Sequence, residues 1–317
     1  MRTKLPSGRE QPRFAGICTF GRYPRIEDVT HEVDWAVFGA PFDSAVTHRP
    51  GARFGPRAIR EASQYLKPYS IAHDINVCEV LSLADAGDVP VRPFSSEETR
   101  DSVIEHAGVI GDPTHTKLLM LGGDHSLAYA GLQSAWTRVG EPAGGLAMLH
   151  FDSHVDTVDE VWGSRWSHAS PFIRAVEDGI LDPKRMISIG IKGPLNTSTD
   201  LDYARDHGVE MVTYDGWQAD GPARLAAFLD RLGDDPAYLS FDIDVVDPVY
   251  APGTGTPSIG GFTSAEILTI LRSCKGISLC GADVVEVLPD RDVAGNTALL
   301  AAHVAFEVLC LDAITRT

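Results

Sequence analysis

Residues 145–156, with the sequence GLAMLHFDSHVD, join a short apolar run to a closely spaced set of acidic and imidazole side chains. Leu146 to Phe151 have the length and apolar character of a buried strand, and Asp152, His154 and Asp156 follow directly. Alternate residues of an extended backbone point to the same side, so these three side chains are expected to face one direction. The segment predicts a strand of an α/β sheet with a polar site at its carboxyl end.

Similar apolar and β-branched runs recur along the chain, and each has the length of a buried strand. They cover residues 33–40, 117–123, 145–151, 186–191, 237–243 and 277–287. Segments with helical spacing lie at residues 57–66, 127–139, 170–178, 222–232, 264–272 and 294–311. Strands that alternate with helices predict an α/β fold with a mostly parallel sheet and helices on both faces.

The domain organisation is expected to be simple. Residues 1–30 are rich in Pro, Gly and Arg, which predicts an irregular N-terminal arm. Residues 31–317 contain no low-complexity linker and no repeat period, and we expect them to form one catalytic domain.

The charge and hydropathy of the chain exclude several classes of partner. It has 44 acidic and 27 basic residues, a formal charge of −17, which repels phosphate backbones and anionic lipids. No apolar run approaches the ~20 residues that a membrane helix needs, and the N-terminus lacks the apolar core of a signal peptide. The five cysteines have no CxxC spacing and indicate reduced thiols. We therefore expect no nucleic acid partner, no membrane association and a cytoplasmic location.

Three other predicted strands also lead into acidic or imidazole side chains. Residues 117–121 lead into GGDH (122–125), Phe241 precedes Asp242 and Asp244, and Val285 precedes Glu286. The carboxyl ends of parallel strands meet at one edge of a sheet, where ligands bind. Six side chains are therefore expected in one crevice: His125, Asp152, His154, Asp156, Asp242 and Asp244.

This set of ligands is typical of a divalent metal site, because it mixes hard carboxylate oxygens with imidazole. Four aspartates carry four negative charges, which two divalent cations would balance and one would not. Each motif alone has a simpler explanation, since an Asp-Xaa-Asp or a GGDH segment often forms a turn or a helix cap. We expect the nearby His150 to be a core histidine on the face opposite to Asp152.

Five segments resemble the ureohydrolases, the arginase and agmatinase superfamily, and in particular its agmatinase-like branch. They are GGDHS (122–126), HFDSHVDT (150–157), SFDIDVVDP (240–248), APGTGTP (251–257) and VVEVLP (284–289). The resemblance implies an arginase-like three-layer α/β/α domain, a homo-trimer or homo-hexamer, and a metal-dependent hydrolase with two divalent ions. Mn²⁺ is the expected metal, with Ni²⁺ as the alternative because imidazole also suits nickel.

The resemblance also implies a role for each residue. One ion would be held by His125, Asp152, Asp156 and Asp242, and the other by Asp152, His154, Asp242 and Asp244. Asp156 would orient the attacking water, Glu286 would accept the guanidinium NH groups, and His168 would carry a proton to the departing amine.

The expected substrate is a small guanidino compound, which would be hydrolysed to urea and an amine. Agmatine or a guanidino acid such as guanidinobutyrate is expected, with an N-substituted guanidine, a biguanide or free guanidine as the alternative. Formiminoglutamate hydrolysis and a non-catalytic paralogue subunit are further alternatives. The loops at residues 44–48, 157–172 and 288–292 depart from the family pattern beside the expected pocket, and Asp159 with Glu160 disfavours a carboxylate tail.

Overall fold

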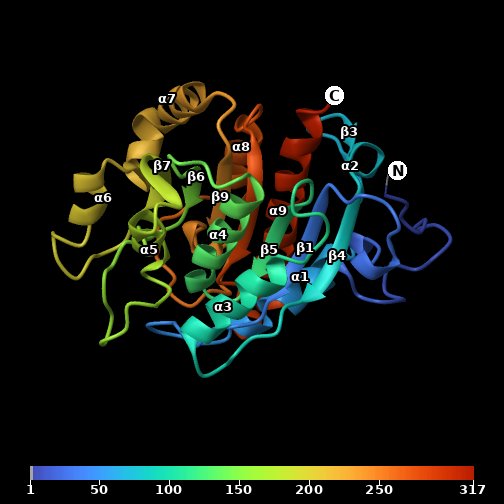
Figure 1. Cartoon of the computed structure of the whole chain (residues 1–317), viewed down its shortest axis with the longest axis horizontal. Coiled ribbons are helices and arrows are strands. Elements are labelled where there is room, and N and C mark those ends of the chain that lie inside the picture. The colour runs from blue at the N-terminus through green and yellow to red at the C-terminus, as the bar shows by residue number, and fades with distance from the viewer. Residues whose placement is uncertain (1–2) are drawn as a thin grey trace.

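The computed structural model describes residues 3–317, and its centre is an eight-stranded sheet (Figure 1). In spatial order the strands are β4 (Leu83–Asp88), β1 (Trp35–Ala40), β5 (Lys117–Gly122), β10 (Leu279–Val285), β9 (Ala237–Asp242), β6 (Leu146–Phe151), β7 (Leu181–Ile191) and β8 (Glu210–Thr213). All the neighbouring strands of this sheet pair in parallel. Their carboxyl ends therefore share one edge.

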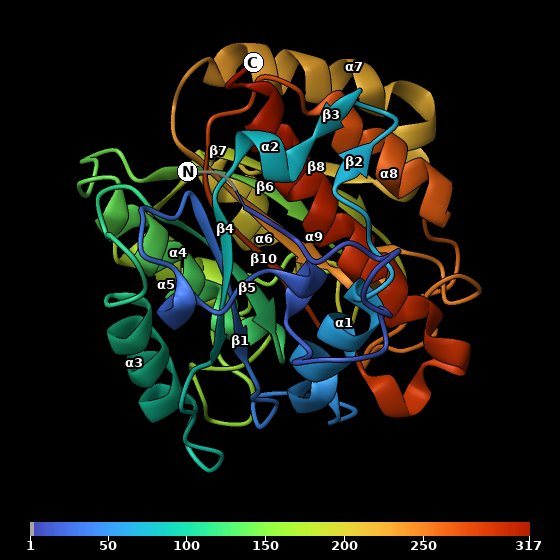
Figure 2. The same ribbon diagram turned by 90° about the vertical axis from the view of Figure 1, so that its right-hand side faces the viewer.

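Helices cover both faces of the sheet, so the expected three-layer α/β/α architecture is confirmed (Figure 2). One layer contains α1 (Gly55–Ser63), α2 (Val77–Val80), α7 (Tyr214–Leu232), α8 (Ser264–Ser273) and α9 (Asn296–Ile314). The other contains α3 (Ser96–Ala107), α4 (Ala128–Arg138), α5 (Pro171–Glu177) and α6 (Asp202–His207). Along β5, Leu119 and Leu121 pack toward the first layer, whereas Leu118 and Met120 pack toward the second.

The order of the strands brings four distant segments of the chain together. β5, β10, β9 and β6 are adjacent in the middle of the sheet, and they are the strands that precede the polar motifs. Residues about 160 positions apart, such as His125 and Glu286, thus leave neighbouring strands at the same edge.

The structure also contains elements that the sequence patterns did not predict. Both edge strands, β4 and β8, are partly polar, and β8 is also short. A small antiparallel hairpin joins β2 (Tyr69–Ser70) to β3 (Ile75–Asn76). Helix α7 was expected to begin at Pro222, but it begins at Tyr214 and carries this proline inside. Thr213 caps its first turn by accepting a hydrogen bond from the Gly216 amide at 3.0 Å.

Thr3 contacts the chain at the edge strand β4, whereas most side chains of residues 6–18 are exposed. Thr3 Oγ1 donates to the Leu81 carbonyl at 3.0 Å, and short 3₁₀ turns form at Phe20–Arg22 and Ile26–Asp28. At the other end of the chain, residues 293–314 have the length and apolar composition of a membrane-spanning helix. The sequence patterns predicted no apolar run of this length. Most of this segment is buried inside the protein, as in a core helix.

Candidate metal centre and active site

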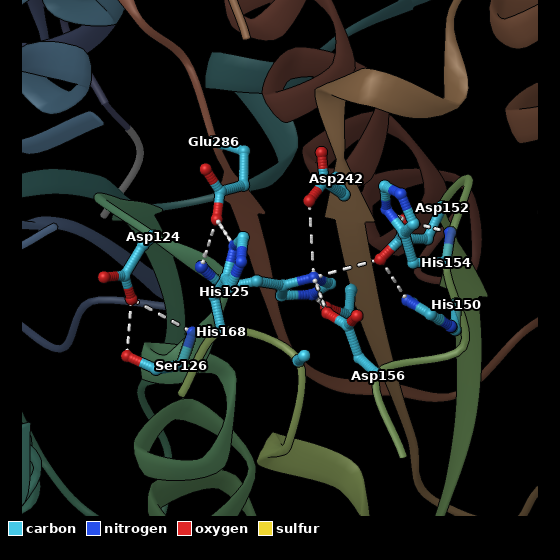
Figure 3. A network of polar contacts seen from close by, with 12 residues as sticks. Asp124, His125, Ser126, His150, Asp152, His154, Asp156, His168, Asp242 and Glu286 are labelled. Carbon is cyan, nitrogen blue, oxygen red and sulfur yellow. Dashed lines mark hydrogen bonds and ion pairs between the residues drawn. The ribbon is translucent and has the colours of Figure 1, made fainter. Parts of the chain in front are cut away.

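The polar motifs of the four central strands meet at the carboxyl edge of the sheet (Figure 3). His125 opens a 3₁₀ turn that follows β5, Asp152 and Glu286 directly follow β6 and β10, and Asp242 is the last residue of β9. The side chain of Asp242 accepts a hydrogen bond from the Asp244 amide at 2.8 Å. This local turn places two acidic residues next to each other at the end of one strand.

Gly123 allows the β5 loop to lie directly on its neighbours. A Cβ atom at this position would lie 1.7 Å from the Phe42 carbonyl oxygen, so only glycine fits. The Gly123 amide donates to Ala40 O at 2.9 Å, and its carbonyl accepts from the Glu286 amide at 2.9 Å. Gly123, the second glycine of GGDH, therefore fixes the separation between the loop of His125 and the loop of Glu286.

Three carboxylates converge on Nδ1 of His125. This atom lies 2.9 Å from Asp156 Oδ2, 3.1 Å from Asp152 Oδ2 and 3.4 Å from Asp242 Oδ2. It is buried, yet it forms no hydrogen bond with any residue of the described chain. A nitrogen without a partner that faces three carboxylate oxygens is the arrangement expected of ligands around a cation.

A second cluster forms around the more exposed His154. Its Nδ1 lies 3.1 Å from Asp244 Oδ2 and 3.3 Å from Asp152 Oδ1. Asp152 therefore directs one oxygen toward His125 and the other toward His154. Asp242 contacts the His125 cluster through Oδ2, whereas its Oδ1 receives the Asp244 amide. The structure thus brings all six predicted ligand residues together. Among them, Asp152 lies between the two histidines and directs one carboxylate oxygen to each.

The proton of His125 is fixed on the far side of its ring. Nε2 lies 2.9 Å from Ser240 Oγ, and the Ser240 hydroxyl donates to Asp283 Oδ1 at 2.8 Å. Because the hydroxyl proton is directed to Asp283, Ser240 accepts the proton of His125 Nε2. Nδ1 of the neutral ring then keeps its lone pair for the carboxylate side.

The cluster carries excess negative charge. Burial, with the neighbouring Asp244 and Asp152, raises the pKa of Asp242 well above its ordinary value. Burial opposes protonation of His125, but its three carboxylate neighbours raise the pKa of this imidazole well above its ordinary value. Divalent cations would relieve both effects, because they neutralise carboxylates and bind neutral imidazole. The donor set and the partnerless His125 Nδ1 therefore fit a metal centre.

The side chain of His150 lies on a different face of its strand from the one predicted. It is buried and both ring nitrogens have partners, Ser188 Oγ at 3.0 Å and Asp152 Oδ2 at 2.9 Å. It was expected to face away from Asp152, but residues two apart lie on the same face of a strand. His150 therefore helps to orient Asp152 through this hydrogen bond, which the sequence patterns did not predict.

Glu286 lies beside this cluster and has one unused oxygen. Oε1 accepts hydrogen bonds from the His125 amide at 2.9 Å and from His168 Nδ1 at 3.0 Å. Oε2 is buried and has no partner among the described residues. Thr47 lies on the other side of His168, and its amide donates to His168 Nε2 at 3.0 Å. Since Nε2 accepts, the His168 proton in this arrangement resides on Nδ1 and points at Glu286.

Two residues of the site have unusual backbone conformations. Asp156 has φ +49° and Glu286 has φ +62°, both in the left-handed region that side chains other than glycine rarely adopt. Such residues persist where the surrounding structure determines the conformation, and they often lie in functional sites.

A cavity of about 490 Å³ opens onto the cluster and is lined in part by His154, Asp156, His168 and Asp242. This volume suits a small organic molecule. A larger hollow of about 790 Å³ lies between the N-terminal segment and α1, near Arg13 and Tyr65, and is remote from these side chains.

The fold and this site define a known class of protein. The chain belongs to the arginase family, whose model matches residues 33–311. Enzymes of this family depend on a binuclear metal centre, and the chain is a ureohydrolase.

Individual relatives are similar over almost the whole chain. The guanidinobutyrase of Pseudomonas aeruginosa is 38% identical over 96% of this chain and 95% of its own length. The agmatinase of Gallus gallus is 39% identical over 96% of this chain and 88% of its own length. The solved structure of proclavaminate amidinohydrolase from Streptomyces clavuligerus has a TM-score of 0.88 at 38% identity, covering 96% and 99% of the two chains.

Proposed function

We propose that the chain hydrolyses a small guanidino compound to urea and an amine at a binuclear manganese centre. The observation that carries the proposal is the pair of clusters around His125 and His154, which share Asp152. One ion would be held by His125, Asp152, Asp156 and Asp242. The other would be held by Asp152, His154, Asp242 and Asp244. When bound, the two ions would supply Lewis acidity and activate a water molecule for attack.

The residues around the ions would hold the substrate and move its protons. Glu286 Oε2 is a buried carboxylate oxygen without a partner, and a guanidinium NH group would satisfy it by a charge-assisted hydrogen bond. Asp156 would orient the attacking water through its carboxylate. His168 lines the cavity and contacts Glu286, so it is placed to pass a proton to the departing amine.

The guanidino head is the chemical feature that the substrates of the relatives share. Guanidinobutyrase and agmatinase are named for compounds whose tails differ in charge. Both compounds contain a planar, positively charged guanidino head, which matches an acidic site.

The test is urea release by the purified, metal-free chain after addition of Mn²⁺ or Ni²⁺ to separate samples. We expect two ions per chain, and urea from at least one member of a panel of guanidino compounds. Full activity with a single tightly bound ion contradicts the binuclear centre. Formamide from formiminoglutamate, or no product from any compound, contradicts the proposed reaction. Higher activity with Ni²⁺ than with Mn²⁺ contradicts only the metal assignment.

We also propose a homo-trimer or homo-hexamer in the cytoplasm. The exposed aromatic side chains of Phe14 and Phe94 are available for contacts between subunits. All five cysteines are free thiols and four of them are buried, which suits a reducing compartment. Light scattering of the purified chain tests the subunit number.

A further inference from the structure

The outer part of the cavity is apolar. Beyond His154 and His168, its walls include Val158, Val161, Trp162, Pro194, Leu195 and Leu201. Trp162 is 83% exposed and Leu195 is 42% exposed, so large apolar side chains face solvent at the mouth of this cavity. An exposed apolar group loses unfavourable contact with water when a ligand covers it. The walls therefore favour a substituent that is itself apolar.

No lysine or arginine lines this cavity within residues 3–317. The nearby cations are directed elsewhere. Lys192 donates to the Asp244 carbonyl at 2.8 Å and to the Ser258 carbonyl at 3.1 Å, behind the metal cluster. Arg165 pairs with Glu177 at 2.9 Å. A carboxylate at the tail of a substrate would therefore lose water without gaining a cationic partner, which is costly.

The one carboxylate on the outer wall, Asp200, holds its own loop. Its Oδ2 accepts from the amides of Asn196 at 2.8 Å and Thr197 at 3.2 Å, and its Oδ1 accepts from Thr197 Oγ1 at 2.7 Å. These hydrogen bonds lower the pKa of Asp200, so it stays ionised. The charge of Asp200 repels an anionic tail and attracts an ammonium tail, but water weakens both effects and its oxygens already accept three hydrogen bonds.

We propose that the substrate is a guanidine with an uncharged, apolar N-substituent, and that the enzyme discriminates against guanidino acids. The inference rests on the proposed function, because it assumes that the guanidino head occupies Glu286 and the metal cluster. It assigns Leu195, Trp162 and Asp200 to substrate selection at the tail.

Three substrates of similar length separate the effects of tail charge. n-Pentylguanidine is neutral at the tail, agmatine is cationic and 4-guanidinobutyrate is anionic. With the manganese-loaded enzyme we expect kcat/KM to be highest for n-pentylguanidine, lower for agmatine and at least tenfold lower for 4-guanidinobutyrate. Equal or faster hydrolysis of either charged compound overturns the inference and leaves the hydrolase assignment intact. Urea from none of the three overturns the inference, and the proposed function is overturned as well only when no other compound of the guanidino panel yields urea.

A substitution at the cavity wall tests the same inference from the enzyme side. Leu195→Arg adds a cation at an exposed position, where folding tolerates it, and should raise the ratio of 4-guanidinobutyrate to n-pentylguanidine turnover about tenfold. Val249→Arg is the matched control, because Val249 is 79% exposed and lies outside the cavity. An unchanged ratio in Leu195→Arg, or an equal change in both variants, overturns the role of this wall.

Discussion

The hydroxyl oxygen of Ser240 lies 2.9 Å from Nε2 of His125 and accepts the proton of that ring nitrogen. Ser240 reaches this position from β9, whereas His125 follows β5, two strands away in the sheet. The contact determines which nitrogen of His125 remains free for a metal ion, because Ser240 directs its own proton to Asp283. Residues outside the predicted ligand set thus determine the protonation of one predicted ligand.

Removal of this hydroxyl should weaken metal binding. In Ser240→Ala, His125 loses the acceptor that fixes its tautomer, and we expect about 10- to 100-fold lower affinity for Mn²⁺. Calorimetric titration of the metal-free protein measures this without an activity assay. Ser134→Ala is the control, since Ser134 is also a buried serine but donates to the Ala130 carbonyl within α4. Equal affinities in the wild-type protein and Ser240→Ala contradict the role of Ser240.

The two ions should depend differently on their ligands. Asp152→Asn should disrupt both ions, because Asp152 faces both histidine clusters, whereas Asp244→Asn should chiefly release the ion near His154. Elemental analysis after dialysis counts the ions. Asp242→Asn is expected to disrupt both ions as well. Tight retention of one ion in Asp152→Asn or Asp242→Asn contradicts bridging by that residue.

Glu286→Gln tests how the guanidinium is held. Glutamine keeps the size of the side chain and an acceptor for the His125 amide, but it removes the negative charge at Oε2. The loss of a buried charged partner costs about 2–5 kcal/mol, or roughly 30- to several-thousand-fold in kcat/KM. Metal content and thermal unfolding should change little. A variant that keeps its metals and near-normal turnover removes Glu286 from the substrate site, and loss of metal indicates a structural role.

Activity should rise with pH between about 7 and 9, because His168 must begin as the neutral ring if it is to accept a proton before passing it to the departing amine. Burial lowers the pKa of His168, but the adjacent Glu286 carboxylate outweighs this effect and raises that pKa to about 9. The arrangement in which Thr47 donates to His168 Nε2 needs the neutral ring, which becomes populated as pH rises through that value. A substrate guanidinium has a pKa far above this range and stays charged throughout it.

The measurement is a pH profile of kcat/KM with the metal content checked at each point. His168→Asn should lose this inflection while its bound metal is retained. A wild-type rate that is flat or falls between neutral and moderately alkaline pH, with both ions bound, contradicts this assignment.

The middle of the sheet could be predicted from the sequence, because its strands are buried on both faces and form continuous apolar runs. The predicted run at 145–151 corresponds to Leu146–Phe151, and the run at 237–243 corresponds to Ala237–Asp242. The edge strand Glu210–Thr213 has only one fully buried residue, so its pattern resembles a loop. Helix α7 was predicted too short because Pro222 resembles a helix start more than an interior residue.

The candidate ligands could be predicted because they follow buried strands at regular spacing. The residues that hydrogen-bond to the side chains of the site could not be predicted. Thr47 and His168 are 121 residues apart, and Ser240 and His125 are 115 residues apart. No local pattern encodes such hydrogen bonds, which depend on strand order and on the separation of the loops. The order of β5, β10, β9 and β6 became known only from the structure.

The left-handed backbone of Asp156 and Glu286 has a consequence for engineering this protein. Each conformation costs about 1–2 kcal/mol for a residue with a Cβ atom, and glycine would relieve that cost at either position. In the proposed site both side chains serve metal or substrate binding, so glycine at either position would remove a proposed function together with the strain. In variants selected only for heat tolerance, glycine at Asp156 or Glu286 should therefore coincide with loss of urea release.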